Sequence, residues 1–164
     1  MIKLDAEHKE YAEKLLKHIF IGSQLDGVKF GLGPAALLIR FQHYYRDHFP
    51  DQLWLNIESR WGVLPKNTGY FPNSEDEMSE LSEEDEYKLI FGLRREKIVN
   101  VKLGKLAPHL HIEFESGRTL FVNGHHHKYE CWQAGNGLGS NGNEWFVVAT
   151  PGDGISSWAP ESFS

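Results

Sequence analysis

The stretch that decides the fold reads Leu110-His111-Ile112-Glu113-Phe114-Glu115-Ser116-Gly117-Arg118-Thr119-Leu120-Phe121-Val122. Apolar residues alternate on both sides of a short polar turn that ends in glycine, which is the pattern of a β-hairpin. A type I turn with Gly117 in the left-handed conformation pairs Ile112 with Leu120 and Leu110 with Val122. This register gathers the aliphatic side chains on one face and leaves His109, His111 and Glu113 on the other, more solvated face.

Outward from this hairpin, the pattern predicts two helices and a series of strands. The first helix begins after Asp5, a helix-capping residue type, and ends near Gly22. The second begins after Ser82 and ends at Gly92 as a left-handed cap. The predicted strands are 24–30, 36–42, 53–63, 98–103, 110–114, 119–122, 130–133, 144–149 and 155–158, and residues 150–154 form a hairpin turn between the last two.

The two halves of the chain resemble each other. Val28, Leu37 and Phe41 recur as Val101, Leu110 and Phe114 at a constant offset of 73 positions. We therefore predict one domain over residues 1–164, with an internal duplication of about 4–64 and 81–159. The expected fold class is α+β, with antiparallel sheets built from two similar helix–meander halves and two main helices.

Composition favours a folded cytoplasmic protein. The 164 residues are 40% hydrophobic and 13% aromatic, enough for a packed core. The N-terminus lacks the apolar segment of a secretory signal, and no stretch approaches the roughly 20 apolar residues of a membrane span. The single cysteine, Cys131, excludes an internal disulfide and suits a reducing compartment. Its apolar neighbours predict a buried, inert thiol.

Negative charge is concentrated in one segment. Between Ser74 and Lys88 there are eight acidic residues and one lysine, a local charge of −7 that leaves about +1 for the rest of the −6 total. Such a segment repels nucleic acid and anionic membranes and attracts a cationic partner. We therefore expect neither nucleic acid nor a membrane as a partner. The acidic residues are Glu75, Asp76, Glu77, Glu80, Glu83, Glu84, Asp85 and Glu86.

Histidines offer the alternative function. In the hairpin register above, His109, His111, His125 and His127 approach one another, and imidazoles gathered in this way can bind zinc and support hydrolysis. The sequence contains no HExxH motif and no cysteine pair beside them, and no catalytic or cofactor motif elsewhere. A metal-binding enzyme that uses these histidines is therefore the alternative hypothesis. The leading one is a protein that acts by binding another protein, and for that function no cofactor is expected.

Three motifs carry a resemblance to a known family. They are Leu-x-Ile-x-Phe-x-x-Gly-x-x-Leu at 110–120, Tyr-Glu-Cys-Trp at 129–132 and Val-Val-Ala-Thr-Pro-Gly-Asp-Gly-Ile-Ser-Ser-Trp at 147–158. In these the chain resembles small β-rich bacterial proteins encoded beside toxin genes, which include immunity proteins of contact-dependent growth inhibition and other polymorphic-toxin systems. The likeness covers mainly 81–160 and, more loosely, 19–64. It supplies no catalytic residue and does not include the acidic segment.

The resemblance and the charge together give the leading hypothesis. The resemblance implies a toxin inhibitor, a cytoplasmic immunity protein that binds a cognate toxin domain and occludes it. The acidic segment predicts that this domain is cationic, as a nuclease is, because carboxylates complement a positively charged groove.

Overall fold

The computed structural model describes residues 6–33, 36–45, 49–66, 72–78, 80–138 and 142–163. Within them the chain forms two α-helices, one 3₁₀ turn and ten strands. They are α1 (Ala6–Phe20), β1 (Gln24–Phe30), β2 (Leu37–Gln42), β3 (Gln52–Ile57), β4 (Trp61–Leu64), η1 (Glu75–Glu77), α2 (Glu83–Gly92), β5 (Ile98–Leu103), β6 (Leu110–Phe114), β7 (Thr119–Val122), β8 (Trp132–Gly135), β9 (Phe146–Thr150) and β10 (Gly154–Trp158). The predicted α+β class is confirmed.

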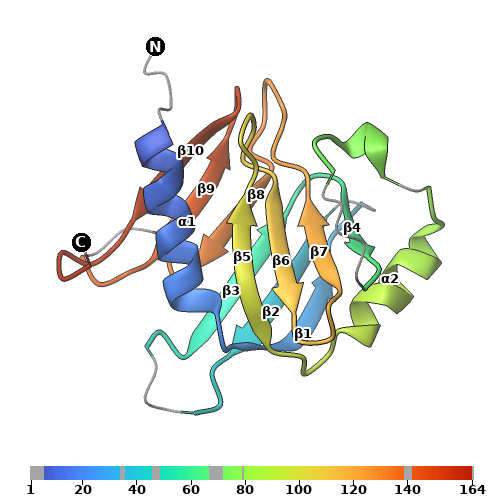
Figure 1. The fold of residues 1–164 in the computed structure, drawn as a ribbon, viewed down its shortest axis with the longest axis horizontal. Coiled ribbons are helices and arrows are strands. Elements are labelled where there is room, and N and C mark those ends of the chain that lie inside the picture. Colours follow the sequence, from blue (N-terminus) through green and yellow to red (C-terminus); the bar gives the residue numbers. More distant parts are fainter. Residues whose placement is uncertain are drawn as a thin grey trace.

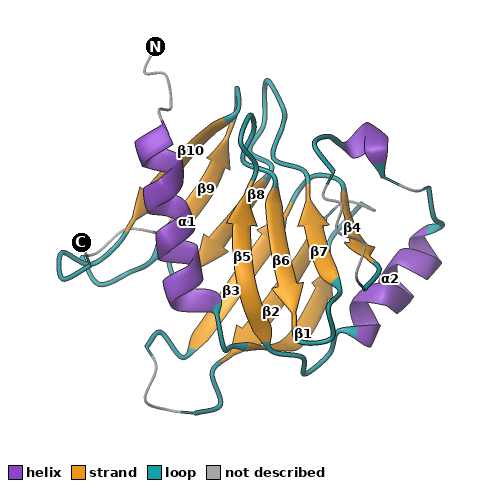
Figure 2. Cartoon of the chain, viewed as in Figure 1, coloured by secondary structure: helices purple, strands orange, loops and turns teal. Residues whose placement is uncertain are grey.

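Two antiparallel sheets face each other (Figures 1 and 2). One has six strands in the order β1-β2-β3-β8-β9-β10, and the other has four in the order β4-β7-β6-β5. Helix α1 lies beside β5 and contacts β10, whereas α2 lies beside β4 (Figure 1). Between the layers, the buried side chains form one continuous cluster that includes Ile39, Leu55, Ile112 and Trp132.

The β6–β7 hairpin has the predicted register. Leu110 pairs with Val122 and Ile112 with Leu120, and Gly117 has φ 91°. Its amide donates to the Phe114 carbonyl at 2.9 Å. Alternation of apolar residues and one glycine therefore fix this register, because a slip by one residue turns every apolar side chain to the wrong face.

The strand predicted over 53–63 is wrong, since the chain changes sheets within it. Strand β3 pairs with β8, whereas β4 pairs with β7 in the other sheet. At the crossing, the Glu58 amide donates to Cys131 O at 2.9 Å and Arg60 O accepts from the Asn123 amide at 2.8 Å. The backbone stays hydrogen-bonded through the corner, so nothing in the local sequence marks the break. Strands β8 and β9 each begin two residues later than predicted.

The hairpins β1–β2 and β5–β6 share their register at the offset of 73. Leu25 pairs with Phe41 as Ile98 pairs with Phe114, and a bulge follows at the same place in each pair. Gly31 donates to Ala36 O and Gly104 to His109 O, both at 2.9 Å. Equivalent residues thus make equivalent contacts in two different sheets.

The halves also contact each other reciprocally. The Gly22 amide donates to Ile98 O at 2.8 Å, and the Arg95 amide, 73 positions later, donates to Leu25 O at 2.7 Å. Gln24 forms an antiparallel bridge with Lys97, its own equivalent. Reciprocity of this kind is the property of a two-fold axis. It is what a duplication predicts, and the duplication itself stays a proposal.

Of the two predictions for the ends of α2, one is confirmed and the other is wrong. Ser82 caps α2, because its Oγ accepts from the Asp85 amide at 3.1 Å. Gly92, however, is not the left-handed cap. It is the last helical residue, and the positive φ falls at Arg95, the equivalent of Gly22. Asp5 lies outside the described residues.

Candidate protein-binding site

The acidic segment lies at one end of the molecule, beyond β4 (Figure 1). Glu75, Asp76 and Glu77 form the 3₁₀ turn η1, and Glu83 to Glu86 form the first turn of α2. Seven of the eight acidic side chains are exposed, and only Glu86 is half-buried. Acids in a first helical turn complement the helix dipole, so part of this charge stabilises α2 itself.

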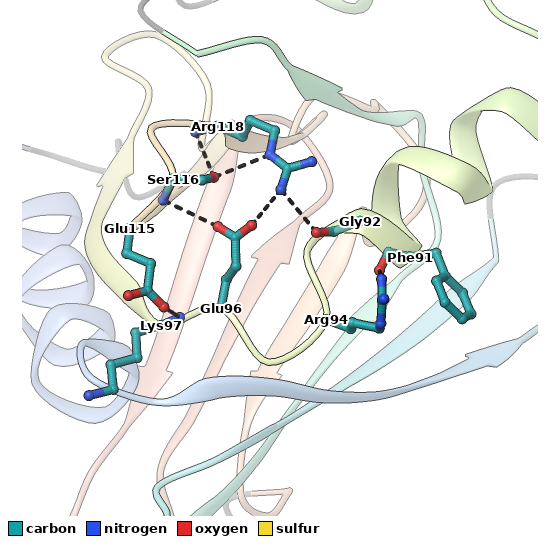
Figure 3. A network of polar contacts seen from close by, with 8 residues as sticks. All are labelled: Phe91, Gly92, Arg94, Glu96, Lys97, Glu115, Ser116 and Arg118. Carbon is teal, nitrogen blue, oxygen red and sulfur yellow. Dashed lines mark hydrogen bonds and ion pairs between the residues drawn. The ribbon is translucent and has the colours of Figure 1, made fainter.

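A polar network attaches the end of α2 to the β6–β7 turn (Figure 3). The Arg118 guanidinium donates from Nη2 to Gly92 O at 2.9 Å and forms an ion pair with Glu96. Glu96 also accepts from the Ser116 amide, and Ser116 Oγ accepts from Arg118 Nε at 3.2 Å. Because Arg118 is only 27% exposed and Glu96 16%, this ion pair is shielded from solvent and holds α2 in place.

Several acidic side chains already have partners. Glu84 and Asp85 lie 3.8 and 4.0 Å from Lys88 Nζ, and Glu86 lies 3.9 Å from Arg60. Burial raises the pKa of Glu86 above its ordinary value, and Arg60 opposes that shift. The remaining five include three carboxylates, Glu75, Glu80 and Glu83, that form no ion pair with any described residue. These are available to an external cation.

Glu75 also borders a hollow of about 530 Å³, which we call the polar hollow. Its wall carries three carboxylates, from Glu58, Glu75 and Glu130, and the side chains of Arg60, His125, His126 and Tyr129. The acidic character of η1 therefore continues into a concave surface between the β3–β4 corner and the loop that precedes β8.

A second hollow of about 530 Å³ shares Glu58 and Glu130 with the first, and we call it the sheet groove. It lies on the face of the six-stranded sheet that points away from the core, and its lining includes Leu38, Arg40, Trp54, Gln133, Leu138 and Phe146. Gln133 Nε2 donates to both shared carboxylates, at 2.8 Å to Glu58 and 2.9 Å to Glu130. The Gln133 side-chain oxygen accepts from Asn56 at 2.7 Å, which fixes the amide orientation.

The histidines predicted on a solvated face are buried instead. His109 and His111 are 4% and 5% exposed, and both pack against Phe121. Backbone groups at Pro72 and Asn73, in a segment that sequence periodicity cannot place, lie close to the two rings and favour their charged forms. Burial lowers the pKa of His109, and lowers the pKa of His111 to about 4, because desolvation disfavours the charged imidazole.

The structure does not gather the four histidines around one point. His109 Nδ1 accepts from the Gly124 amide at 2.9 Å, and His125 Nδ1 bonds Asp153. His127 is exposed and stacks on His126 with ring centres 5.1 Å apart. Among the described residues, no three histidine, cysteine, aspartate or glutamate side chains are placed to share a metal ion.

The burial of His111 gives a pH-dependent stability. Its folded-state pKa of about 4 lies below the ordinary 6.5, so the unfolded chain binds the proton first and acid favours unfolding. We expect the free energy of unfolding to fall between pH 6.5 and pH 4, by an amount on the order of 3 kcal/mol from this residue.

Denaturant titrations across that pH range measure the effect. His111→Gln removes the titrating group and is expected to flatten the curve, whereas His127→Gln, on an exposed histidine, is the control and leaves it unchanged. Parallel curves for His111→Gln and the unsubstituted protein would contradict this account of His111.

Cys131 is buried, as the sequence predicts. Its side chain is 1% exposed, and burial raises the pKa of the thiol to about 11. Since the thiolate is the nucleophile, a thiol with so high a pKa is inert at neutral pH. Cys131 lines the polar hollow as a structural residue.

No match results from comparing the chain with protein-family models, curated proteins or solved structures. In the described part of the chain, no helix is both long and apolar enough to cross a membrane.

Sequence reasoning missed the residues of the sheet groove. The predicted strand 53–63 carries Trp54, Asn56 and Glu58 at alternate positions, and that pattern alone puts them on one face. The other wall comes from Glu130, Gln133 and Leu138, which pairing of β3 with β8 brings alongside. No local signal reports pairing between segments so far apart in the sequence.

Proposed function

We propose that this protein is an immunity protein of a bacterial contact-dependent growth inhibition or related polymorphic-toxin system. It binds a cognate cationic toxin domain, such as a nuclease, and neutralises it by occluding the active surface. The observation that carries the proposal is the exposed acidic end of the molecule, where Glu75, Glu80 and Glu83 form no ion pair with a described cation and Glu75 lines the polar hollow.

Electrostatics gives this surface a specific task. The rest of the chain is nearly neutral, so the field of the molecule is strongest around η1 and the start of α2. A localised field of one sign orients an approaching partner of the other sign and raises the association rate. Carboxylates on a convex end beside a hollow complement a groove lined by lysine and arginine, which is how a nuclease binds phosphates.

The direct test mixes the purified protein with the toxin domain encoded by the neighbouring gene. We expect a one-to-one complex and loss of toxin activity in that mixture. A toxin that remains fully active at low salt, with no complex detected, would remove the proposal.

A charge variant tests the role of the acidic end. Glu75→Gln, Glu80→Gln and Glu83→Gln together are expected to slow association about tenfold at low salt and to weaken its salt dependence, with a smaller change in dissociation. The matched control is Glu7→Gln, Glu10→Gln and Glu161→Gln, three exposed acids outside this segment with the same change in net charge. Stopped-flow rates that are equal for the two triple variants would show that the partner docks elsewhere.

A further inference from the structure

The outer face of the six-stranded sheet carries a row of large side chains. Backbone pairing aligns Arg40, Trp54, Gly135, Phe146 and Trp158 across five neighbouring strands. The ring centres of Trp54 and Phe146 are 5.8 Å apart, and those of Phe146 and Trp158 are 5.3 Å apart. These rings lie outside the core cluster, which takes the alternate residues of the same strands.

The sheet groove opens on this face beside Trp54 and Phe146. Leu138 stands at its rim with 72% of its side chain exposed, although leucine is usually buried. Leu38, on β2, adds to the apolar lining of the groove. An apolar hollow rimmed by polar residues is the usual form of a protein-recognition site.

Charge is divided between the two ends of the groove. Along β3 and just past its end, the outward positions run from Trp54, which pairs with Arg40, through Asn56 to Glu58. At the second end, Glu58 and Glu130 both accept from one amide nitrogen of Gln133, and no described cation forms an ion pair with either. Gln133 is itself 9% exposed, so its position is fixed. Two adjacent carboxylates repel each other unless a cation joins them.

We propose that the sheet groove is a docking site for a protein segment that presents a lysine or arginine beside a large apolar residue. The cationic group lies between Glu58 and Glu130, and the apolar side chain packs on Trp54, Phe146 and Leu138. This inference rests on the proposed function and deepens it, because it assigns the partner's second contact and the chemistry that the groove selects. The acidic end steers the partner, and the groove determines its specificity.

Blocked dipeptides test the groove without the toxin. N-acetyl-Leu-Arg-amide is titrated into ¹⁵N-labelled protein, with N-acetyl-Leu-Gln-amide as the neutral comparison. We expect the indole N–H signals of Trp54 and Trp158 and the side-chain amide signals of Gln133 to shift, and the arginine peptide to bind about fivefold more tightly. Equal affinity for the two peptides, or shifts confined to other regions, would overturn the assignment.

Variants separate the two parts of the site. Glu58→Gln with Glu130→Gln keeps acceptors for Gln133 and is expected to abolish the preference for arginine. Leu138→Ser is expected to weaken both peptides by about fivefold. The controls are Glu10→Gln on α1 and Leu106→Ser, whose side chain is 89% exposed outside the groove, and neither changes binding. A loss of binding in either control equal to that in its matched groove variant would overturn the inference.

The same variants in the toxin complex distinguish the two proposals. If the complex forms and Glu58→Gln, Glu130→Gln and Leu138→Ser together leave its affinity unchanged, the groove assignment fails and the proposed function stands. If the peptides bind as expected but the toxin forms no complex, the groove assignment stands and the proposed function fails. We expect the combined variant to weaken the complex at least tenfold.

Discussion

Replacing Gly135 by alanine is expected to lower the free energy of unfolding by roughly 3–5 kcal/mol. Gly135 ends β8 with φ 149°, a backbone conformation that side chains rarely adopt. An added Cβ would also lie 2.0 Å from Trp145 O, which belongs to backbone and has nowhere to move without separating β8 from β9. Denaturant unfolding, read from the midpoint at constant slope, measures the loss.

Gly27 provides a matched control for Gly135. It lies in the same row of the same sheet, on edge strand β1, where a Cβ would meet only Arg40 Cβ at 3.9 Å. Gly27→Ala is therefore expected to change the free energy of unfolding by no more than about 0.5 kcal/mol. Equal losses for the two variants would mean that the close approach of Trp145 O to Gly135 does not restrain the sheet.

Trp132→Ala is expected to lower the free energy of unfolding by about 4–8 kcal/mol. The Trp132 side chain is fully buried in the core, so its removal leaves a cavity worth about 3–5 kcal/mol. Its Nε1 also donates to Pro108 O at 2.9 Å, and the orphaned carbonyl adds about 1–3 kcal/mol in a buried site. Against a total stability of about 5–15 kcal/mol, this variant is close to unfolded.

Trp132→Phe separates the two contributions. The phenyl ring fills most of the space but cannot donate to Pro108 O, so we expect a loss of about 2–3 kcal/mol, between the intact protein and Trp132→Ala. A phenylalanine variant as stable as the unsubstituted protein would contradict the role assigned to the Trp132–Pro108 hydrogen bond.

Local patterns predicted the parts of the fold that local chemistry controls. The β6–β7 register follows from alternation and from Gly117, and the start of α2 follows from Ser82. The similarity at offset 73 has a counterpart in the matched bulges and the reciprocal Gly22 and Arg95 hydrogen bonds. These features depend on neighbours in the sequence or on a repeat visible within it.

The errors arose where distant segments decide the outcome. The corner at 58–60 reads as continuous strand in the sequence, because its backbone partners, Cys131 and Asn123, are distant along the chain. Alternation predicts a solvated face for His111 wrongly, because it assigns a residue to one side of a sheet and says nothing of what covers that side. Arg95 adopts the left-handed conformation, and its amide donates to Leu25 O. Gly92 does not adopt it, although glycine is the residue type that prefers this conformation after a helix.

The candidate site, like the fold, is predictable from the sequence only in part. The acidic end was predicted from charge alone, and the structure places its carboxylates on the exposed turn η1 and the start of α2. The sheet groove needs β3 beside β8, a pairing that only the folded chain shows.

The central claim is that a cationic protein binds the acidic end and the adjoining hollows. Amide hydrogen exchange, compared between the free protein and its complex with the neighbouring toxin domain, tests that claim most directly. The account predicts new protection in 58–60, in η1 and the start of α2, and in 123–131, with edge strand β1 unchanged. Protection confined to β1 and β5, with exchange in those three regions unaltered, would contradict it.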